Sequence, residues 1–148
     1  MPKLTVGPNP DRLLMVQDKI SDLDFKKLFG TAEESSQQLT LYIPDKDRNG
    51  RPIKNLKEWI SEAMKLLTTI GGGATAFPPA DGSWFDPEKK STVWEKTTII
   101  YTFIIPEKFE ANIRNLKNFL CRFGRETGQG EVVFQFHGNF YKIREFGL

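Results

Sequence analysis

The stretch VWEKTTIIYTFII, residues 93–105, is the longest run of β-forming residues in the chain. Side chains of a strand alternate between its two faces. One face of this run is apolar from Ile99 onward through Tyr101, Phe103 and Ile105, whereas the other mixes threonine with isoleucine. We therefore expect Tyr101 and Phe103 to point into the core and the second face to be half exposed. This pattern favours an antiparallel sheet that is covered on one side.

Periodic segments on both sides of this strand predict the rest of the fold. In chain order they are a strand at 39–43, a helix at 55–70, a strand at 74–77, the central strand, a helix at 107–123, and strands at 131–136 and 140–146. The first six elements follow the split βαβ, or ferredoxin-like, order. The sequence thus predicts an α+β fold, with two helices on one face of an antiparallel sheet and a C-terminal edge strand.

Residues 1–38 are expected to form an N-terminal extension to a ferredoxin-like α+β domain at 39–148. Three prolines and a glycine in the first ten residues are typical of a loose arm. Phe25, Leu28 and Phe29 fall on one helical face, which predicts a short helix over 22–29 that ends at Gly30. Such an extension would lie against the main domain or grip a partner.

Composition narrows the class of protein. A chain of 148 residues suits one domain with a substantial core. The net charge of +2 leaves a nucleic-acid partner open but does not indicate one. The lone Cys121 precludes an internal disulfide, and no apolar run is long enough to cross a membrane. With no signal-peptide pattern at the N-terminus, we expect a cytoplasmic protein.

No metal or cofactor is predicted. His137 is the only histidine and Cys121 the only cysteine, so the usual zinc ligands are too few. The loop DKDRNG at 45–50 copies the first half of a calcium loop, but Leu56 stands where the twelfth position needs a glutamate. The three glycines at 71–73 close a helix instead of opening one, which predicts a helix end and not a phosphate loop.

Glu95 and His137 are the candidate acid–base groups. Glu95 shares a face with Tyr101 and Phe103, so it is either a polar group at a pocket or half of a structural ion pair. Burial would raise its pKa in the first case. His137 is the only side chain whose usual pKa lies near neutrality, although His-Gly-Asn is also typical of a hairpin turn. Arg122 and Arg125 make the second long helix basic and are candidate anion-binding residues.

Four short motifs fall between Leu39 and His137: Gly-Gly-x-Thr at 72–75, Gly-x-Trp at 82–84, the strand residue Glu95, and Gln-x-x-Val at 129–132. Together they resemble the pattern of an uncharacterised bacterial family of small α+β proteins. The resemblance implies a ferredoxin-like fold and a bacterial or phage origin, and it implies no activity. It groups Thr75, Trp84, Glu95 and Gln129 as one candidate site.

The leading functional hypothesis is a small soluble binding or regulatory module that recognises a protein or a nucleotide-like ligand. Its candidate ligand-binding residues are Thr75, Trp84, Arg122, Arg125 and Gln129. A protein partner or a homodimer is expected by analogy with other ferredoxin-like sheets. The alternative is a metal-independent ribonuclease, or another phosphodiester-acting enzyme, that uses Glu95 and His137. A third hypothesis is a small-molecule pocket between the sheet and Trp84, with Glu95 and Thr75 as polar anchors.

Overall fold

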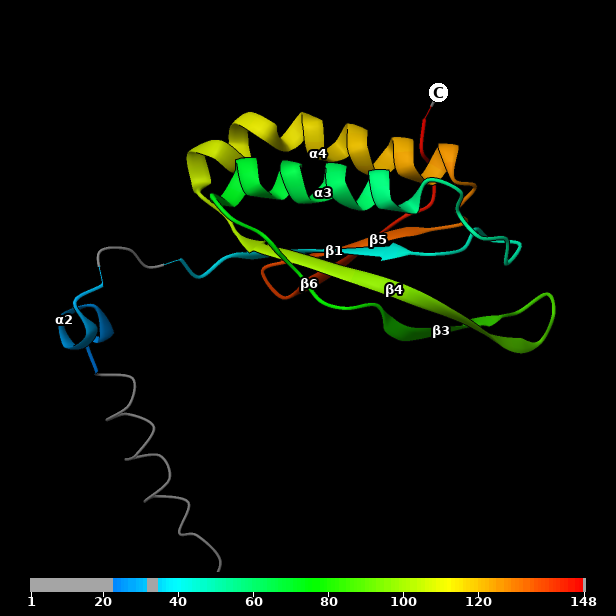
Figure 1. Cartoon of the computed structure of the whole chain (residues 1–148), viewed down its shortest axis with the longest axis horizontal. Coiled ribbons are helices and arrows are strands. Elements are labelled where there is room, and N and C mark those ends of the chain that lie inside the picture. The colour runs from blue at the N-terminus through cyan, green and yellow to red at the C-terminus, as the bar shows by residue number, and fades with distance from the viewer. Residues whose placement is uncertain (1–22, 32–34, 148) are drawn as a thin grey trace, which may run out of the picture. The chain divides into compact units, whose positions relative to one another are not determined.

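A computed structural model describes residues 23–31 and 35–147, which fall into two units divided between residues 34 and 35 (Figure 1). Within the first unit, helix α2 spans Phe25–Phe29. The Asp24 side chain caps it by accepting a hydrogen bond from the Lys27 amide, and Gly30 ends it at φ 64°. The short helix predicted from the sequence is therefore present, with a later start, while residues 1–22 lie outside the described part.

The second unit is a six-stranded antiparallel sheet with two long helices. Its elements are β1 Gln38–Pro44, α3 Leu56–Gly71, β2 Thr75–Ala76, β3 Ala80–Asp86, β4 Ser91–Phe103, α4 Pro106–Glu126, β5 Val132–Phe136 and β6 Asn139–Ile143. The strand order is β2-β4-β1-β5-β6, and β3 also pairs with β4. This confirms the α+β fold, in which the ferredoxin-like order gains β6 as an added edge strand.

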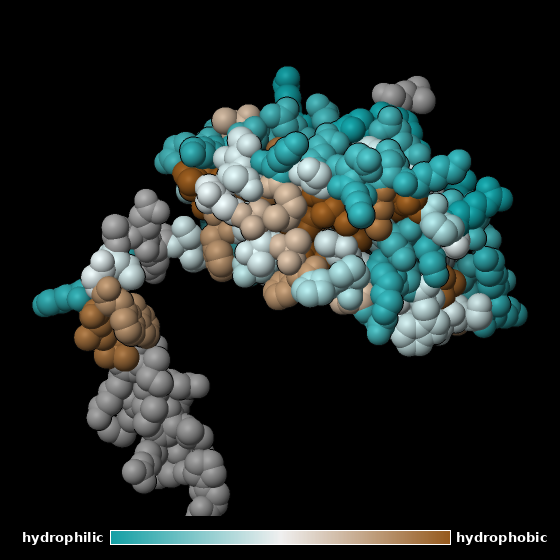
Figure 2. Space-filling model, in the orientation of Figure 1, coloured by the Kyte–Doolittle hydropathy of each residue, from teal (hydrophilic) through white to brown (hydrophobic). Residues whose placement is uncertain are grey.

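Both long helices lie on the same face of the sheet, as expected (Figure 1). The core between them contains Leu41 of β1, Ile100 of β4, Trp59 of α3 and Phe123 of α4. The ring centroids of Trp59 and Phe123 lie 5.3 Å apart in an edge-to-face arrangement. Figure 2 shows hydrophilic side chains over the helices and a hydrophobic band between the helices and the sheet. None of the described helices is long and apolar enough to cross a membrane.

The facing of β4 is opposite to the one predicted. Thr98, Ile100, Thr102 and Ile104 are buried beneath the helices, whereas Tyr101 is half-buried and Phe103 is 44% exposed on the uncovered face. Register explains the reversal, because the buried β1 residues Leu39, Leu41 and Ile43 stand opposite Thr102, Ile100 and Thr98. A shift of one residue would move a whole side-chain set to the other face, so the pairing partner decides the facing.

A threonine suits position 102 of β4 because α3 ends very close to the strand there. A Cβ atom on Gly71, the last residue of α3, would lie 2.6 Å from the carbonyl oxygen of Phe103 and would overlap the Thr102 side chain. The Thr102 hydroxyl donates a hydrogen bond of 2.5 Å to the Gly73 carbonyl oxygen. A larger apolar side chain at Thr102 would lose this bond and would not fit beneath the helix end.

Strand β3 was not predicted. Residues 78–82 include Pro78, Pro79, Asp81 and Gly82, which are typical of turns, but Ala80–Asp86 pairs with the first half of β4 in a long hairpin. Glycine is tolerated in β3 because β4 is its only partner among the described strands, and both prolines precede the strand.

The hairpin turn predicted at His137-Gly138 is confirmed. It joins β5 to β6, with φ angles of 49° at His137 and 82° at Gly138. Two successive residues with positive φ match the twist of an antiparallel hairpin, so β6 follows β5 directly and becomes the edge strand.

Replacing Gly71 by alanine tests the close approach of α3 to β4. We expect Gly71→Ala to lower the free energy of unfolding by about 1–3 kcal/mol, because the new methyl group overfills a packed contact. Gly73→Ala is the matched control, because a Cβ atom there would meet nothing within 4 Å. Urea unfolding at equilibrium measures both changes. Equal stability of the two variants would contradict this account of the packing.

Candidate functional site

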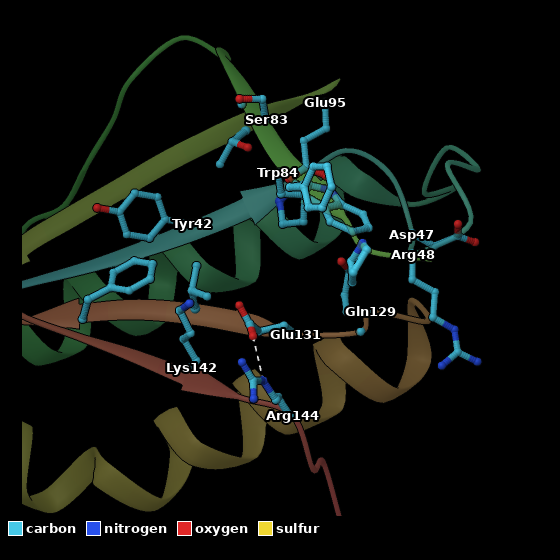
Figure 3. Close-up of a pocket in the computed structure, with 18 residues that line it drawn as sticks. Tyr42, Asp47, Arg48, Ser83, Trp84, Glu95, Gln129, Glu131, Lys142 and Arg144 are labelled. Carbon is cyan, nitrogen blue, oxygen red and sulfur yellow. Dashed lines mark hydrogen bonds and ion pairs between the residues drawn. The ribbon is translucent and has the colours of Figure 1, made fainter. Parts of the chain in front are cut away.

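A pocket of about 790 Å³ lies on the sheet face that the helices leave uncovered (Figure 3). Strands β1, β3, β4, β5 and β6 and the loop that follows β1 all contribute to its wall. Its volume is within the usual range of roughly 300–1,000 Å³ for small-molecule sites. The aromatic and ionisable residues among its lining are Tyr42, Trp84, Phe85, Phe140, Asp47, Arg48, Glu95, Glu131, Lys142 and Arg144.

Aromatic rings come to this pocket from three strands. Tyr42 of β1 donates a hydrogen bond of 3.0 Å from its hydroxyl to Oε1 of Gln135. Its ring meets that of Phe140 of β6 edge-on, with centroids 6.0 Å apart. Trp84 of β3, which pairs with Val93, lies on the side of the pocket near Glu95 (Figure 3). The pocket therefore offers flat apolar surfaces on which a planar ring can pack.

Glu95 of β4 supplies a carboxylate beside these rings. It stands opposite Gly82 of β3, where a Cβ atom would lie 2.9 Å from Thr97 Oγ1 and 3.5 Å from Glu95 Cγ, so the close approach at this glycine is that of Thr97. Burial raises the pKa of Glu95, the nearby Asp45 carboxylate raises it further, and Lys46 partly opposes both. Glu95 forms no hydrogen bond or ion pair with any described residue, so the structural ion pair considered from the sequence is absent.

The loop after β1 closes one end of the pocket and is not built as a calcium site. The Asp47 carboxylate accepts hydrogen bonds from the backbone amides of Asn49 at 2.8 Å and Arg51 at 2.9 Å. These two hydrogen bonds, of which the one from Arg51 has the larger effect, hold the pKa of Asp47 below its usual range. Gln129 holds this loop in place by donating a hydrogen bond of 3.0 Å from Nε2 to the Lys46 carbonyl oxygen. Among the described residues no cluster of acidic, histidine or cysteine side chains is suited to a metal ion.

Three of the four residues grouped by the resemblance line this pocket, namely Trp84, Glu95 and Gln129. Thr75 does not, because it lies in β2, next to Tyr101 of β4. The structure thus brings together most of that set.

The basic candidates of the second long helix have other contacts. Arg122 forms an ion pair with Glu62 of α3 and lies 4.9 Å from the centre of the Trp59 ring. Arg125 donates a hydrogen bond of 3.2 Å to the Phe146 carbonyl oxygen. Both arginines lie in the helix layer and neither lines the pocket, so they hold the fold together and do not bind an anion in this pocket.

Glu95 and His137 lie at opposite ends of β1. The Asp45 amide bonds to the carbonyl of Lys96, next to Glu95, whereas the His137 amide bonds to the carbonyl of Gln38. Seven residues of extended chain separate Gln38 from Asp45, which is roughly 20 Å. The expectation that Glu95 and His137 act on one substrate in the same copy of the chain is therefore not met.

Sequence reasoning missed Tyr42, Phe140 and Lys142 as pocket residues. Strand register brings the three together. The pairs Thr40–Gln135 and Gln135–Phe140 place Phe140 near Tyr42, and Lys142 pairs with Val133, which also lines the pocket. The alternation of Phe140 and Lys142 along the last strand is visible in the sequence. Placing that alternation on the uncovered face requires the strand order, which the sequence alone does not provide.

The raised pKa of Glu95 predicts a pH-dependent cost to stability. A carboxyl whose pKa is higher in the folded state stabilises the fold only when it is protonated, so this contribution is lost as pH rises through the folded pKa. Glu95→Gln should therefore be more stable than the wild type at neutral pH, and the difference should vanish below about pH 4, near the pKa of an unfolded glutamate. Urea unfolding across this range, with Glu110→Gln on the exposed side of α4 as the control, measures it. A difference that is independent of pH would contradict the assignment.

Comparisons with known proteins identify a similar fold. No protein-family model matches the sequence, and no curated protein matches it significantly. A solved structure of a phage SAM lyase in complex with S-methyl-5′-thioadenosine is similar, with a TM-score of 0.53 and 13% identity over 77% of this chain and 95% of that one. A phage SAM lyase in the apo state is also similar, with a TM-score of 0.54 and 12% identity over 80% of this chain and 96% of that one. At this level of identity the likeness is one of fold, and the chain is similar to phage proteins in its α+β architecture.

Proposed function

We propose that this protein binds a cationic, nucleoside-like small molecule in the sheet pocket, and that S-adenosylmethionine is that ligand. The observation that carries the proposal is Glu95, a half-buried carboxylate in the pocket that no described residue pairs. A carboxylate among aromatic faces recognises an organic cation, because both the negative charge and the rings attract it. Trp84, Tyr42 and Phe140 supply those faces.

The structural neighbours support the same ligand chemistry. Both are SAM lyases, and one of them is in complex with S-methyl-5′-thioadenosine. S-adenosylmethionine is a sulfonium ion that carries adenosine, and S-methyl-5′-thioadenosine is what is left of it after loss of the amino-acid chain. The fold by itself does not imply function. Support for the proposal comes from the agreement between the charge of this chain's pocket and the named ligand.

This proposal refines the leading hypothesis from the sequence. Of the two kinds of ligand expected there, the pocket favours the nucleotide-like one, because it is a concave site with few, well-placed polar groups. The ribonuclease alternative finds no support in this geometry, because its two catalytic groups lie at opposite ends of β1. The cytoplasmic location and the homodimer stay predictions, and the likeness to phage proteins agrees with a bacterial or phage origin.

Binding measurements with two closely matched ligands test the role of Glu95. Isothermal titration calorimetry should show that the wild type binds S-adenosylmethionine more tightly than S-adenosylhomocysteine, which has a neutral thioether in place of the sulfonium. Glu95→Gln should weaken binding of S-adenosylmethionine about tenfold, a loss of about 1.4 kcal/mol, and should leave S-adenosylhomocysteine nearly unchanged. Glu110→Gln on α4 is the control. Absence of binding by the wild type, or equal losses for both ligands, would overturn the proposal.

Lyase activity toward the same ligand is a second candidate function. The observation that favours it is again Glu95, because a carboxylate with a raised pKa is a stronger base than a free one. In this step the carboxylate takes a proton from the carbon next to the one bound to sulfur. The electrons of that C–H bond form a C=C bond as the C–S bond breaks. The products are S-methyl-5′-thioadenosine and an unsaturated amino acid.

Chromatography of the reaction products tests the lyase step. Wild-type protein should release S-methyl-5′-thioadenosine from S-adenosylmethionine, and Glu95→Gln should lower kcat by about 100-fold or more if the carboxylate is the base. A loss confined to KM would assign Glu95 to binding alone. Product release by wild type and variant at the same rate would exclude both roles for this residue.

A further inference from the structure

Six charged residues line the pocket, and four of them either have partners within the protein or point away from the pocket. Arg144 and Glu131 form an ion pair with each other, with Nε and Oε2 2.9 Å apart. The Asp47 carboxylate accepts two backbone hydrogen bonds within its own loop. The guanidinium of Arg48 points away from the pocket (Figure 3). These four residues shape the wall without offering a free charge to a ligand inside it.

The two remaining charges, Glu95 and Lys142, have opposite signs and stand on opposite sides of the pocket (Figure 3). Lys142 forms no ion pair with a described residue, and its ammonium group lies 6.0 Å from the centre of the Phe140 ring. The strand order β4-β1-β5-β6 puts three strand spacings, about 14 Å, between the two strands, and the pairing register offsets Lys142 from Glu95 by four residues, about 13 Å, along them. The ring of Tyr42, on β1, also lines the pocket.

We propose that Lys142 is the residue that selects a zwitterionic ligand, by binding its carboxylate while Glu95 faces its positive group. The inference rests on the proposed function and adds the second charge that the ligand must carry. A ligand with a cation alone would leave Lys142 unpaired at the pocket wall and would be repelled by it. A ligand with opposite charges at two separated positions satisfies both side chains, and the aromatic rings of the pocket pack against its neutral part.

Decarboxylated S-adenosylmethionine is the probe that isolates this contact, because it keeps the adenosine, the sulfonium and the amine and lacks only the carboxylate. Calorimetry should show that the full-length wild-type protein prefers S-adenosylmethionine over this probe by about tenfold or more, the worth of one charge-assisted contact. Lys142→Met should abolish the preference by weakening S-adenosylmethionine alone. Lys142→Arg should restore part of it, and Lys117→Met, on the exposed side of α4, should leave it intact.

The outcomes separate the two proposals. If the wild type binds neither compound, the proposed function fails and the role of Lys142 fails with it. If S-adenosylmethionine binds but Lys142→Met weakens both compounds by the same factor, or weakens neither, only the role of Lys142 is overturned. Circular dichroism of each variant checks the fold, and Lys142→Arg keeps the test decisive should the methionine variant not fold.

Discussion

The pairing of β4 with β1 is the constraint on which the rest of the molecule depends. The leucines and isoleucine of β1 that face the helices stand opposite Thr98, Ile100 and Thr102, so this register determines which half of β4 is buried. The alternate side chains of β4 therefore lie on the uncovered face of the sheet. That face receives the rings of Tyr42 and Tyr101 and, near the start of β4, the carboxylate of Glu95. The core and the pocket are thus two consequences of one register.

The architecture was predictable because it depends on long, strongly periodic segments. The helical stripes that include Trp59 and Leu116 and the alternation in β1 all identify elements correctly, and their order is enough to indicate the ferredoxin-like pattern. The facing of β4 was not predictable in the same way. Ile99, Tyr101 and Phe103 form the more apolar face, but burial followed the strand's neighbour and the close approach of Gly71, neither of which a single segment reveals.

Part of the pocket lining could be inferred from the sequence, and part could not. Trp84, Glu95 and Gln129 converge as the grouping of motifs implied, and Glu95 was also conspicuous as a charge on an otherwise apolar face. Arg122 and Arg125 lie outside the pocket, and a basic stretch of helix has the same composition whether it binds anions or contacts its own fold. The pocket residues contributed by β6 depend on long-range pairing, which local pattern does not encode.

The unpaired carboxylate of Glu95 has a consequence for the protein as a whole. An empty pocket keeps a negative charge partly desolvated, which makes the vacant molecule less stable than its packing would allow. Any cation that neutralises the charge returns that energy to the folded state, and mass action makes the gain grow with the concentration of the cation. Resistance to heat and to proteolysis would then rise and fall with the supply of such a cation, so the lifetime of the protein would depend on how much of it is present.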